Sequence, residues 1–135
     1  MTTDYVRPPV IPILVYADIA AAHDFLVDAF GCTPGGVERD GAGNVVHGEV
    51  RIGDSVVWLH RVTHDHGLDA PRRLPWAHGG LSVIVPDIDA HFERAKAAGA
   101  EVLSTPSDQP YGLREYGARD TDGHYWWFAS PIASG

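Results

Sequence analysis

Cysteine is almost absent from this sequence, which holds Cys32 as its single thiol among 135 residues. One thiol cannot form a disulfide within the chain, so nothing in the composition requires an oxidising compartment. No apolar run approaches the roughly 18 residues of a membrane-spanning helix. The first residues, Met-Thr-Thr-Asp, also lack the basic start of a signal peptide. We therefore expect a cytoplasmic protein that makes no contact with a membrane.

Basic residues are scarce as well. The chain carries 10 Lys and Arg against 18 Asp and Glu, a net charge of -8. Binding to nucleic acid requires a basic face, so this composition argues against a nucleic-acid partner. An acidic surface instead favours cationic small molecules, weakly and in a salt-dependent way. With 44% hydrophobic residues, the chain is long enough for one compact domain or two small modules that share a core.

Two common catalytic signatures are missing. The glycines at 41 and 43 connect predicted strands and precede no helix, so they do not form a phosphate-binding loop. Ser55 and Ser82 lie inside strand patterns, so neither occupies the sharp strand-to-helix turn of a hydrolase nucleophile. The sequence thus offers no nucleotide-binding loop and no serine nucleophile.

One order of elements occurs twice along the chain. Each half predicts a buried strand, then a helix that an aspartate caps and a glycine closes, and then three strands of which the last two form a hairpin. In the first half these elements cover residues 10–16, 18–30, 37–39, 45–51 and 55–61, with a turn at 34–36. In the second half they cover residues 81–85, 87–98 and 101–103, a loop that runs to 112, and a hairpin at 114–128.

A single offset relates the two halves. The capping residues Asp18 and Asp87 are 69 positions apart (87 − 18), and Trp58 and Trp127 are also 69 apart (127 − 58). A capped helix and a hairpin tryptophan that share one offset indicate an internal duplication.

The duplication sets the expected domain organisation. We expect an α+β protein with two tandem βαβββ modules, the first at residues 1–62 and the second at residues 80–135. Residues 63–79 contain two prolines and little periodicity, which predicts a linker.

The second module contains the run Tyr-Gly-x-Arg-x4-Arg-Asp-x-Asp-Gly-His at residues 111–124. With this run, the duplicated βαβββ unit resembles the vicinal-oxygen-chelate superfamily of glyoxalases, ring-cleaving dioxygenases and antibiotic-resistance proteins, and within it the bleomycin-resistance-like binding proteins most closely. The resemblance covers about residues 11–131. It implies that the modules form a curved, cup-like mixed sheet and that the protein is a homodimer whose sites lie between modules of two chains.

The resemblance also locates the positions at which metal enzymes of the superfamily hold their ion. Those four positions correspond here to Ile11, Trp58, Gly80 and Trp127. None of these side chains coordinates a divalent cation. We therefore expect neither a metal nor another cofactor.

The hairpin of the first module predicts which side chains line the cup. If Gly53 and Asp54 form a two-residue turn, His47 pairs with His60, Glu49 with Trp58, and Arg51 with Val56, all on one face. The opposite face then carries Val46, Val50, Ile52, Val57 and Leu59, a uniformly apolar set that belongs against the helices.

The offset of 69 extends this face to the second module. It places Arg114, Tyr116, Tyr125 and Trp127 on the cup face, with Ile11, Ile13 and Ser82 at its floor. We expect Trp58 and Trp127 to stack on a ligand, Tyr116 and Tyr125 to contact it, and His47, Glu49, His60 and Arg114 to anchor its polar groups.

These residues and the resemblance together suggest a function. We expect a non-catalytic protein that sequesters an aromatic antibiotic or a related natural product, cationic compounds included, and so confers resistance. One alternative is a glyoxalase-like lyase, isomerase or dioxygenase in which His47 and Glu49 transfer protons, with a relocated metal on His47, Glu49 and His60 or with none. A metal cluster of His60, His64 and His66 is a weaker hypothesis. In a third interpretation the cup holds no ligand and its aromatic side chains meet in a dimer.

Overall fold

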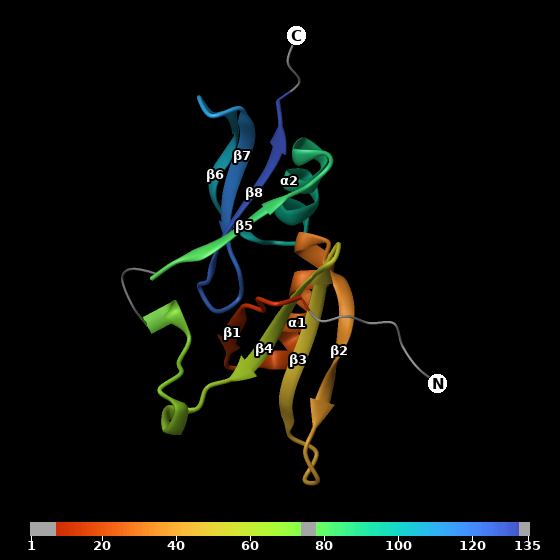
Figure 1. Ribbon diagram of the computed structural model, residues 1–135, viewed down its shortest axis with the longest axis vertical. Coiled ribbons are helices and arrows are strands. Elements are labelled where there is room, and N and C mark those ends of the chain that lie inside the picture. The colour runs from red at the N-terminus through yellow and green to blue at the C-terminus, as the bar shows by residue number, and fades with distance from the viewer. Residues whose placement is uncertain (1–7, 74–77, 133–135) are drawn as a thin grey trace.

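The structure is a computed structural model that describes residues 8–73 and 78–132. Figure 1 shows two four-stranded sheets, one from each half of the chain, with one α-helix packed on each. The first half contributes β1 (Ile13–Tyr16), α1 (Ile19–Phe30), β2 (Thr33–Arg39), β3 (Val45–Ile52) and β4 (Ser55–Arg61). The second contributes β5 (Gly80–Ile84), α2 (Ile88–Ala97), β6 (Glu101–Asp108), β7 (Leu113–Arg119) and β8 (Tyr125–Pro131). Between them lie two 3-10 turns, His64–His66 and Pro71–Arg73.

The two sheets have the same topology. Their strand orders are β1-β4-β3-β2 and β5-β8-β7-β6, and in each the first strand runs parallel to the last strand of its module. This confirms the predicted α+β fold with two tandem βαβββ units. The two sheets stay separate and do not close into a barrel. The division of the chain at residues 62 and 80 stays a prediction, because part of the expected linker, 74–77, lies outside the described residues.

Both helices begin in the way that the sequence predicts. The Asp18 side chain accepts a hydrogen bond from the Ala21 N–H at 3.0 Å, and the Asp87 side chain accepts one from the Ala90 N–H at 3.1 Å. Gly31 ends α1 with a φ of 72°, a conformation that glycine adopts without a steric cost. Within residues 8–73 and 78–132, neither α-helix is long and apolar enough to cross a membrane.

The outer strands are longer than predicted. β2 includes residues 34–36, which the sequence analysis assigns to a turn, and β6 continues to Asp108 through most of the predicted loop. Both are edge strands, where a proline such as Pro34 or Pro106 loses no ladder hydrogen bond on its outer side. Irregular register in both strands accommodates the extra residues.

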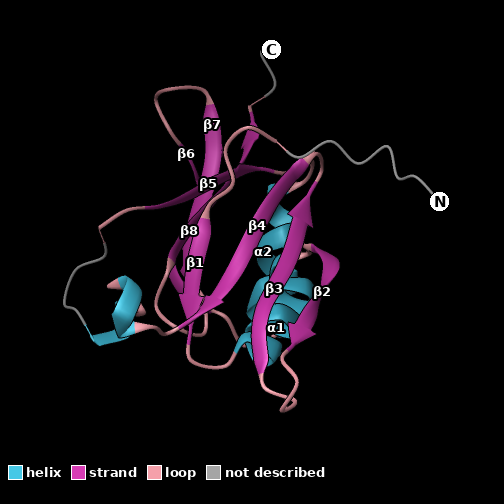
Figure 2. Cartoon of the chain, turned by 60° about the horizontal axis from the view of Figure 1, so that its bottom comes forward, coloured by secondary structure: helices cyan, strands magenta, loops and turns pink. Residues whose placement is uncertain are grey.

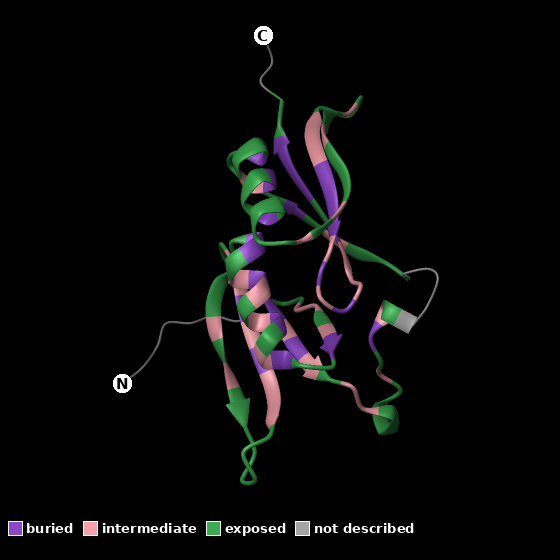
Figure 3. Ribbon diagram, turned by 180° about the vertical axis from the view of Figure 1, so that it is seen from behind, coloured by how far each residue is buried: buried purple, intermediate pink, exposed green. Residues whose placement is uncertain are grey.

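One hydrophobic core connects the two halves. Both helices lie on the same side of the molecule, and Figure 3 shows them forming a column along it. The ring of Phe30, at the end of α1, lies 5.4 Å from the ring of Trp126 and 4.8 Å from that of Phe128 on β8. All three side chains are buried, so the core of each module extends into the other.

The turn between β7 and β8 joins the modules through a buried carboxylate. One oxygen of Asp120 accepts hydrogen bonds from the Tyr16 hydroxyl at 2.5 Å and the Trp126 indole N–H at 3.0 Å. The other oxygen accepts the backbone N–H groups of Asp122 and His124 at 3.1 and 3.0 Å. Burial, reinforced by Asp120, raises the pKa of Tyr16 well above its usual value, so this hydroxyl remains a donor.

The same turn binds the end of β1 at two further points. Asp122 accepts a hydrogen bond from the Ala17 N–H at 2.8 Å, and His124 Nε2 lies 2.7 Å from the Val15 carbonyl oxygen. Because a carbonyl oxygen can only accept, Nε2 of His124 carries the hydrogen. His124 therefore connects the modules, and the Asp-x-Asp-Gly-His run serves as an inter-module clamp.

We predict that Asp120→Ala destabilises the protein by about 3 kcal/mol or more. The change leaves two buried side-chain donors and two backbone N–H groups without their acceptor, and each unsatisfied buried group costs about 1–3 kcal/mol. Urea unfolding monitored by circular dichroism measures the loss. If the alanine variant does not fold, Asp120→Asn provides a milder test, because it replaces one acceptor oxygen by a donor.

Asp40 provides a matched control in the turn between β2 and β3. Its Oδ1 accepts hydrogen bonds from the Ala42 and Asn44 N–H groups, in the same local arrangement as the turn at Asp120, but it is exposed and contacts no second module through this carboxylate. Asp40→Ala should therefore shift the urea midpoint far less. Equal shifts for the two variants would mean that Asp120 acts only within its own turn.

Candidate functional site

Each sheet packs its helix on one face, α1 mainly against β3 and β2, and α2 mainly against β6 and β7. The opposite face is open, as Figure 2 shows for the first sheet, with α1 behind β3 and β4. In the first sheet, the predicted pairs His47 with His60, Glu49 with Trp58, and Arg51 with Val56 are confirmed. The alternate residues Val50, Val57 and Leu59 are buried in the core. The two-residue turn at Gly53 therefore sets the register as expected.

A hydrogen-bonded network fixes the open face of the first sheet. The indole N–H of Trp58 donates to Glu49 Oε1 at 3.0 Å, and Arg51 Nε donates to Glu49 Oε2 at 2.9 Å. The ring of His47 stands edge-on to Trp58, with centroids 5.5 Å apart at 74°. Both oxygens of Glu49 are thus engaged, and the carboxylate orients the indole.

The open face of the second sheet holds the indole of Trp127 over two glycines. A Cβ at Gly80 would come within 2.5 Å of Trp127 Cζ3, and one at Gly117 would come within 3.2 Å of Trp127 Nε1. The ring thus lies across β5, β8 and β7, and the residue as a whole remains 37% exposed. We call this surface, Trp127 with Gly80 and Gly117, the Trp127 shelf. Gly117 is not among the predicted site residues, and its place opposite Trp127 follows once the register is known.

Two side chains continue the face beside the Trp127 shelf. The Tyr125 ring meets that of Trp127 in a T-shaped arrangement, with centroids 5.8 Å apart. The guanidinium of Arg119 lies 4.5 Å from the centre of the Tyr125 ring and donates a hydrogen bond to its hydroxyl. Arg119 is not among the residues that the sequence predicts for this face, because its place opposite Tyr125 follows only from the correct register.

The predicted placement of Tyr116 and Arg114 on this face is wrong. Tyr116 pairs with Phe128, is fully buried in the core, and shares a hydrogen bond with His91 on α2. Arg114 forms ion pairs with Asp89 of α2 and with Asp108. Both side chains therefore lie on the helix side of the sheet.

The length of the hairpin turn explains this error. Arg51 pairs with Val56, with four residues between them (56 − 51 − 1), whereas the equivalent pair, Arg119 with Tyr125, has five between them (125 − 119 − 1). The second hairpin is thus one residue longer, so the offset of 69 that relates β4 to β8 becomes 68 between β3 and β7 (117 − 49). A shift of one residue moves every side chain to the opposite face.

The predicted floor residues lie beside the two tryptophans. Ile13 pairs with Trp58 and is 51% exposed, and Ser82, also exposed, pairs with Trp127. Ile11 precedes β1 and is only partly exposed. The first sheet thus presents an aliphatic side chain next to its indole, whereas the second presents a hydroxyl.

The side-chain donors do not fit a divalent metal ion. Among residues 8–73 and 78–132, no three His, Cys, Asp or Glu side chains gather as a metal site requires. Neither His47, Glu49 and His60 nor His60, His64 and His66 therefore form a group that could hold a metal ion. His64 instead pairs with Asp69 at 3.3 Å.

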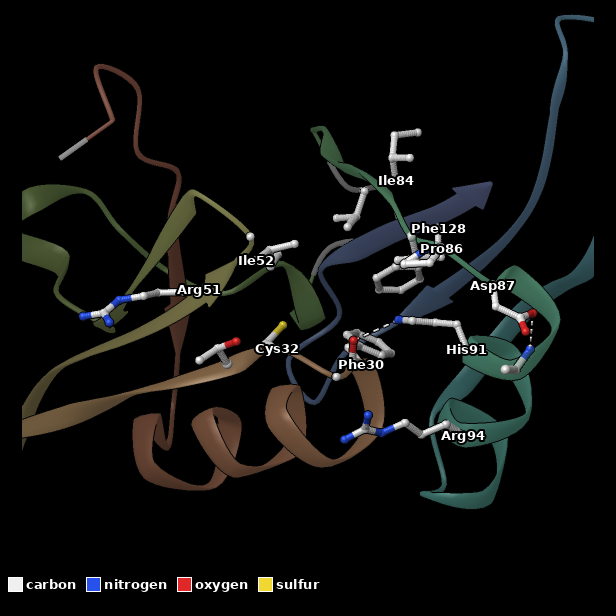
Figure 4. Close-up of a pocket in the computed structure, with 16 residues that line it drawn as sticks. Phe30, Cys32, Arg51, Ile52, Ile84, Pro86, Asp87, His91, Arg94 and Phe128 are labelled. Carbon is white, nitrogen blue, oxygen red and sulfur yellow. Dashed lines mark hydrogen bonds between the residues drawn. The ribbon is translucent and has the colours of Figure 1, made fainter. Parts of the chain in front are cut away.

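A cavity of about 600 Å³ lies away from Trp58 and Trp127, at the junction of the modules (Figure 4). Its walls are mainly apolar, and the side chain of Arg51 points away from its centre. Arg94 donates to the carbonyl oxygens of Val27 and Asp28. Burial raises the pKa of the Cys32 thiol to about 12, which makes it a poor nucleophile. The polar groups in this cavity therefore serve the fold, and the open faces are the better candidate site.

His91 at this junction is held neutral by its surroundings. Its Nε2 lies 2.8 Å from the Phe30 carbonyl oxygen, so Nε2 carries the hydrogen, and its Nδ1 accepts from the Tyr116 hydroxyl at 2.6 Å. Burial, and to a lesser extent the charge of Arg94, lower the pKa of His91, while the hydrogen bond to Phe30 opposes that shift.

We predict that His91 makes the fold sensitive to acid. Its folded-state pKa lies below the unfolded value of about 6.5, so its contribution to stability is present above that pH and is lost as the pH falls below it. The urea midpoint should therefore fall more between pH 7.5 and pH 5.5 in the parent than in His91→Gln. His64→Gln, which changes an exposed histidine, should keep the parent's dependence. The same loss in the parent and in His91→Gln would refute this role.

Comparison with known proteins places the chain in a family. Residues 6–128 match the family model described as Glyoxalase/Bleomycin resistance protein/Dioxygenase superfamily. The chain belongs to this superfamily. The resemblance noted from the sequence is thereby confirmed at the level of the superfamily.

Relatives cover nearly the whole of this superfamily member. An uncharacterized protein of Mycobacterium bovis is 34% identical over 94% of this chain and 86% of its own length. The crystal structure of TioX from Micromonospora sp. ML1 has 31% identity and a TM-score of 0.72, covering 90% of this chain and 97% of that one. A glyoxalase-related enzyme from Clostridium phytofermentans, with 20% identity and a TM-score of 0.69 over 97% and 100% of the two chains, shares the fold.

Proposed function

We propose that this protein binds and sequesters an aromatic antibiotic or a related natural product without changing it chemically, and so confers resistance. The observation that carries this proposal is the Trp127 shelf, in which a tryptophan residue that stays 37% exposed lies across Gly80 and Gly117. Glycines inside strands weaken a sheet, and a large exposed indole is unfavourable in water. Such an arrangement is expected where a flat ring covers the indole.

The chemistry of the two faces suits a flat ring held between them. A stacked aromatic pair contributes about 0.5–1.5 kcal/mol beyond the burial of its area. Two such walls, Trp58 and Trp127, would together tighten Kd by about 5- to 150-fold, since about 1.4 kcal/mol is tenfold. The remaining affinity must come from burial of both faces of the ligand, which requires the two walls to face each other.

A homodimer would bring such walls together. On the open side, Ile13 is 51% exposed and Ile84 58% exposed, which supports burial by a second copy of the chain. We propose that the ligand lies between the Trp58 face of one chain and the Trp127 shelf of its partner. Without a ligand, the same faces would meet as an aromatic dimer interface.

A glyoxalase-like lyase, isomerase or dioxygenase is the less well supported alternative. Its proton transfer would depend on Glu49, whose two oxygens already accept hydrogen bonds from Trp58 and Arg51. A general base needs a free oxygen directed at the substrate. The geometry therefore favours a structural role for Glu49 as the residue that orients Trp58.

Titration of the protein with a panel of aromatic and DNA-damaging antibiotics, followed by tryptophan fluorescence, tests the proposal. We predict saturable quenching for at least one compound, and at least tenfold weaker binding in Trp58→Ala and in Trp127→Ala, because each variant removes one stacking wall. Gly117→Val should also weaken binding, since the added side chain displaces the Trp127 ring without removing it.

Tyr111→Ala is the matched control, because Tyr111 is a 61% exposed aromatic in the loop before β7. This variant should bind as tightly as the parent. If Trp58→Ala and Trp127→Ala both bind the compound as tightly as the parent, the assignment of the site is wrong.

A further inference from the structure

Arg119 lies at one end of the Trp127 shelf and is held in a fixed position. It lies opposite Tyr125 in the hairpin and two residues from Gly117 on the same face of β7. Its guanidinium packs on the Tyr125 ring, 4.5 Å from the centroid, and Nη2 donates to the Tyr125 hydroxyl. Stacking on an aromatic ring limits the rotation of an arginine, so its position is largely set before a ligand arrives.

The charge of Arg119 is only weakly compensated. The carboxylate of Glu101 lies 3.7 Å from Arg119 Nε, beyond hydrogen-bonding distance, and the Glu101 side chain is 64% exposed. Within the described structure, Nε is buried and donates to no acceptor. Buried donors nearly always have partners, so this guanidinium retains donor capacity that the fold does not use.

Two other arginines show the contrast. In Arg51, both Nε and Nη2 lie 2.9 Å from Oε2 of Glu49. Arg114 donates to the carboxylates of Asp89 and Asp108 at 3.1 to 3.3 Å. Both are matched to carboxylates within hydrogen-bonding distance, whereas Arg119 is not.

We infer that Arg119 binds an anionic group, a carboxylate or an anion of similar planar shape, carried by the aromatic ligand whose ring stacks on Trp127. The inference rests on the proposed function and names the chemical class of its ligand. The planar guanidinium matches a carboxylate in shape and can donate two parallel hydrogen bonds. Residues two apart on a strand are about 7 Å apart, so a substituent on a ring above Gly117 reaches Arg119.

The charges along β7 give the ligand a direction. Every second residue of β7 faces the open side, which places Glu115, Gly117 and Arg119 on that face. The Trp127 shelf therefore has a positive end at Arg119 and a negative end at Glu115, about 13 Å apart along the strand. The net charge of -8 repels anions only weakly within a salt solution, where screening acts over about 8 Å. At contact, the guanidinium of Arg119 therefore favours a ligand with a negative charge over one with a positive charge.

Three probes with the same ring system test the inference: naphthalene-2-carboxylate, neutral 2-naphthalenemethanol and cationic 2-naphthylmethylammonium. Binding to the full protein is measured by tryptophan fluorescence and calorimetry. We expect the carboxylate to bind at least tenfold more tightly than either other probe, with an affinity that falls as salt rises. Arg119→Gln should remove this preference and leave binding of the neutral probe within about twofold.

Two further variants separate a role in binding from a role in the fold. Arg119→Lys keeps the charge but loses the planar pair of donors, so it should bind the carboxylate with intermediate affinity. Glu101→Gln removes the competing charge and should tighten binding of the carboxylate. Unchanged neutral-probe binding in both variants shows that the Trp127 shelf is intact.

Several outcomes overturn the inference while leaving the proposed function in place. These are equal binding of the charged and neutral probes to the parent, preference for the cation, or an unchanged carboxylate preference in Arg119→Gln. Failure of all three probes to bind also overturns it, and the antibiotic panel then decides on the proposed function separately.

Discussion

The carboxylate of Asp120 is the interaction on which the arrangement of the two modules depends. It accepts four hydrogen bonds, one from Tyr16 in the first module and three from its own module. A buried carboxylate is tolerated only when its oxygens are satisfied in this way. The turn at Asp40 has the same local hydrogen bonds but lies in solvent, which shows that burial converts an ordinary turn into a connection between halves.

The same turn determines which aromatic residues reach the open face. Its five residues set the pairing of β7 with β8, which sends Tyr116 into the core beside Phe128 and places Gly117 opposite Trp127. A turn with one residue more or fewer would shift β7 by one residue against β8 and turn Tyr116 to the open face. The turn between β7 and β8 therefore contributes to both the buried inter-module clamp and the exposed Trp127 shelf.

The sequence predicted those features that local chemistry decides. Asp18 and Gly31 define the first helix, and the turn at Gly53 sets the register of its hairpin, because capping and tight turns depend on few residues. The placement of Tyr116 failed because it depends on the parity of a longer turn, which composition does not reveal. Arg119 was missed for the same reason, since its place beside Tyr125 follows only from the correct register.

The central claim is that a flat ligand ring lies against the Trp127 indole on the open face. A crystal structure of the protein with the compound that binds most tightly in the antibiotic panel tests this most directly. The account predicts a ring stacked on Trp127 at about 3.5–4.0 Å, with a Trp58 face on its other side. A ring found instead in the cavity beside Phe30 and His91, with the Trp127 indole uncovered, would contradict it.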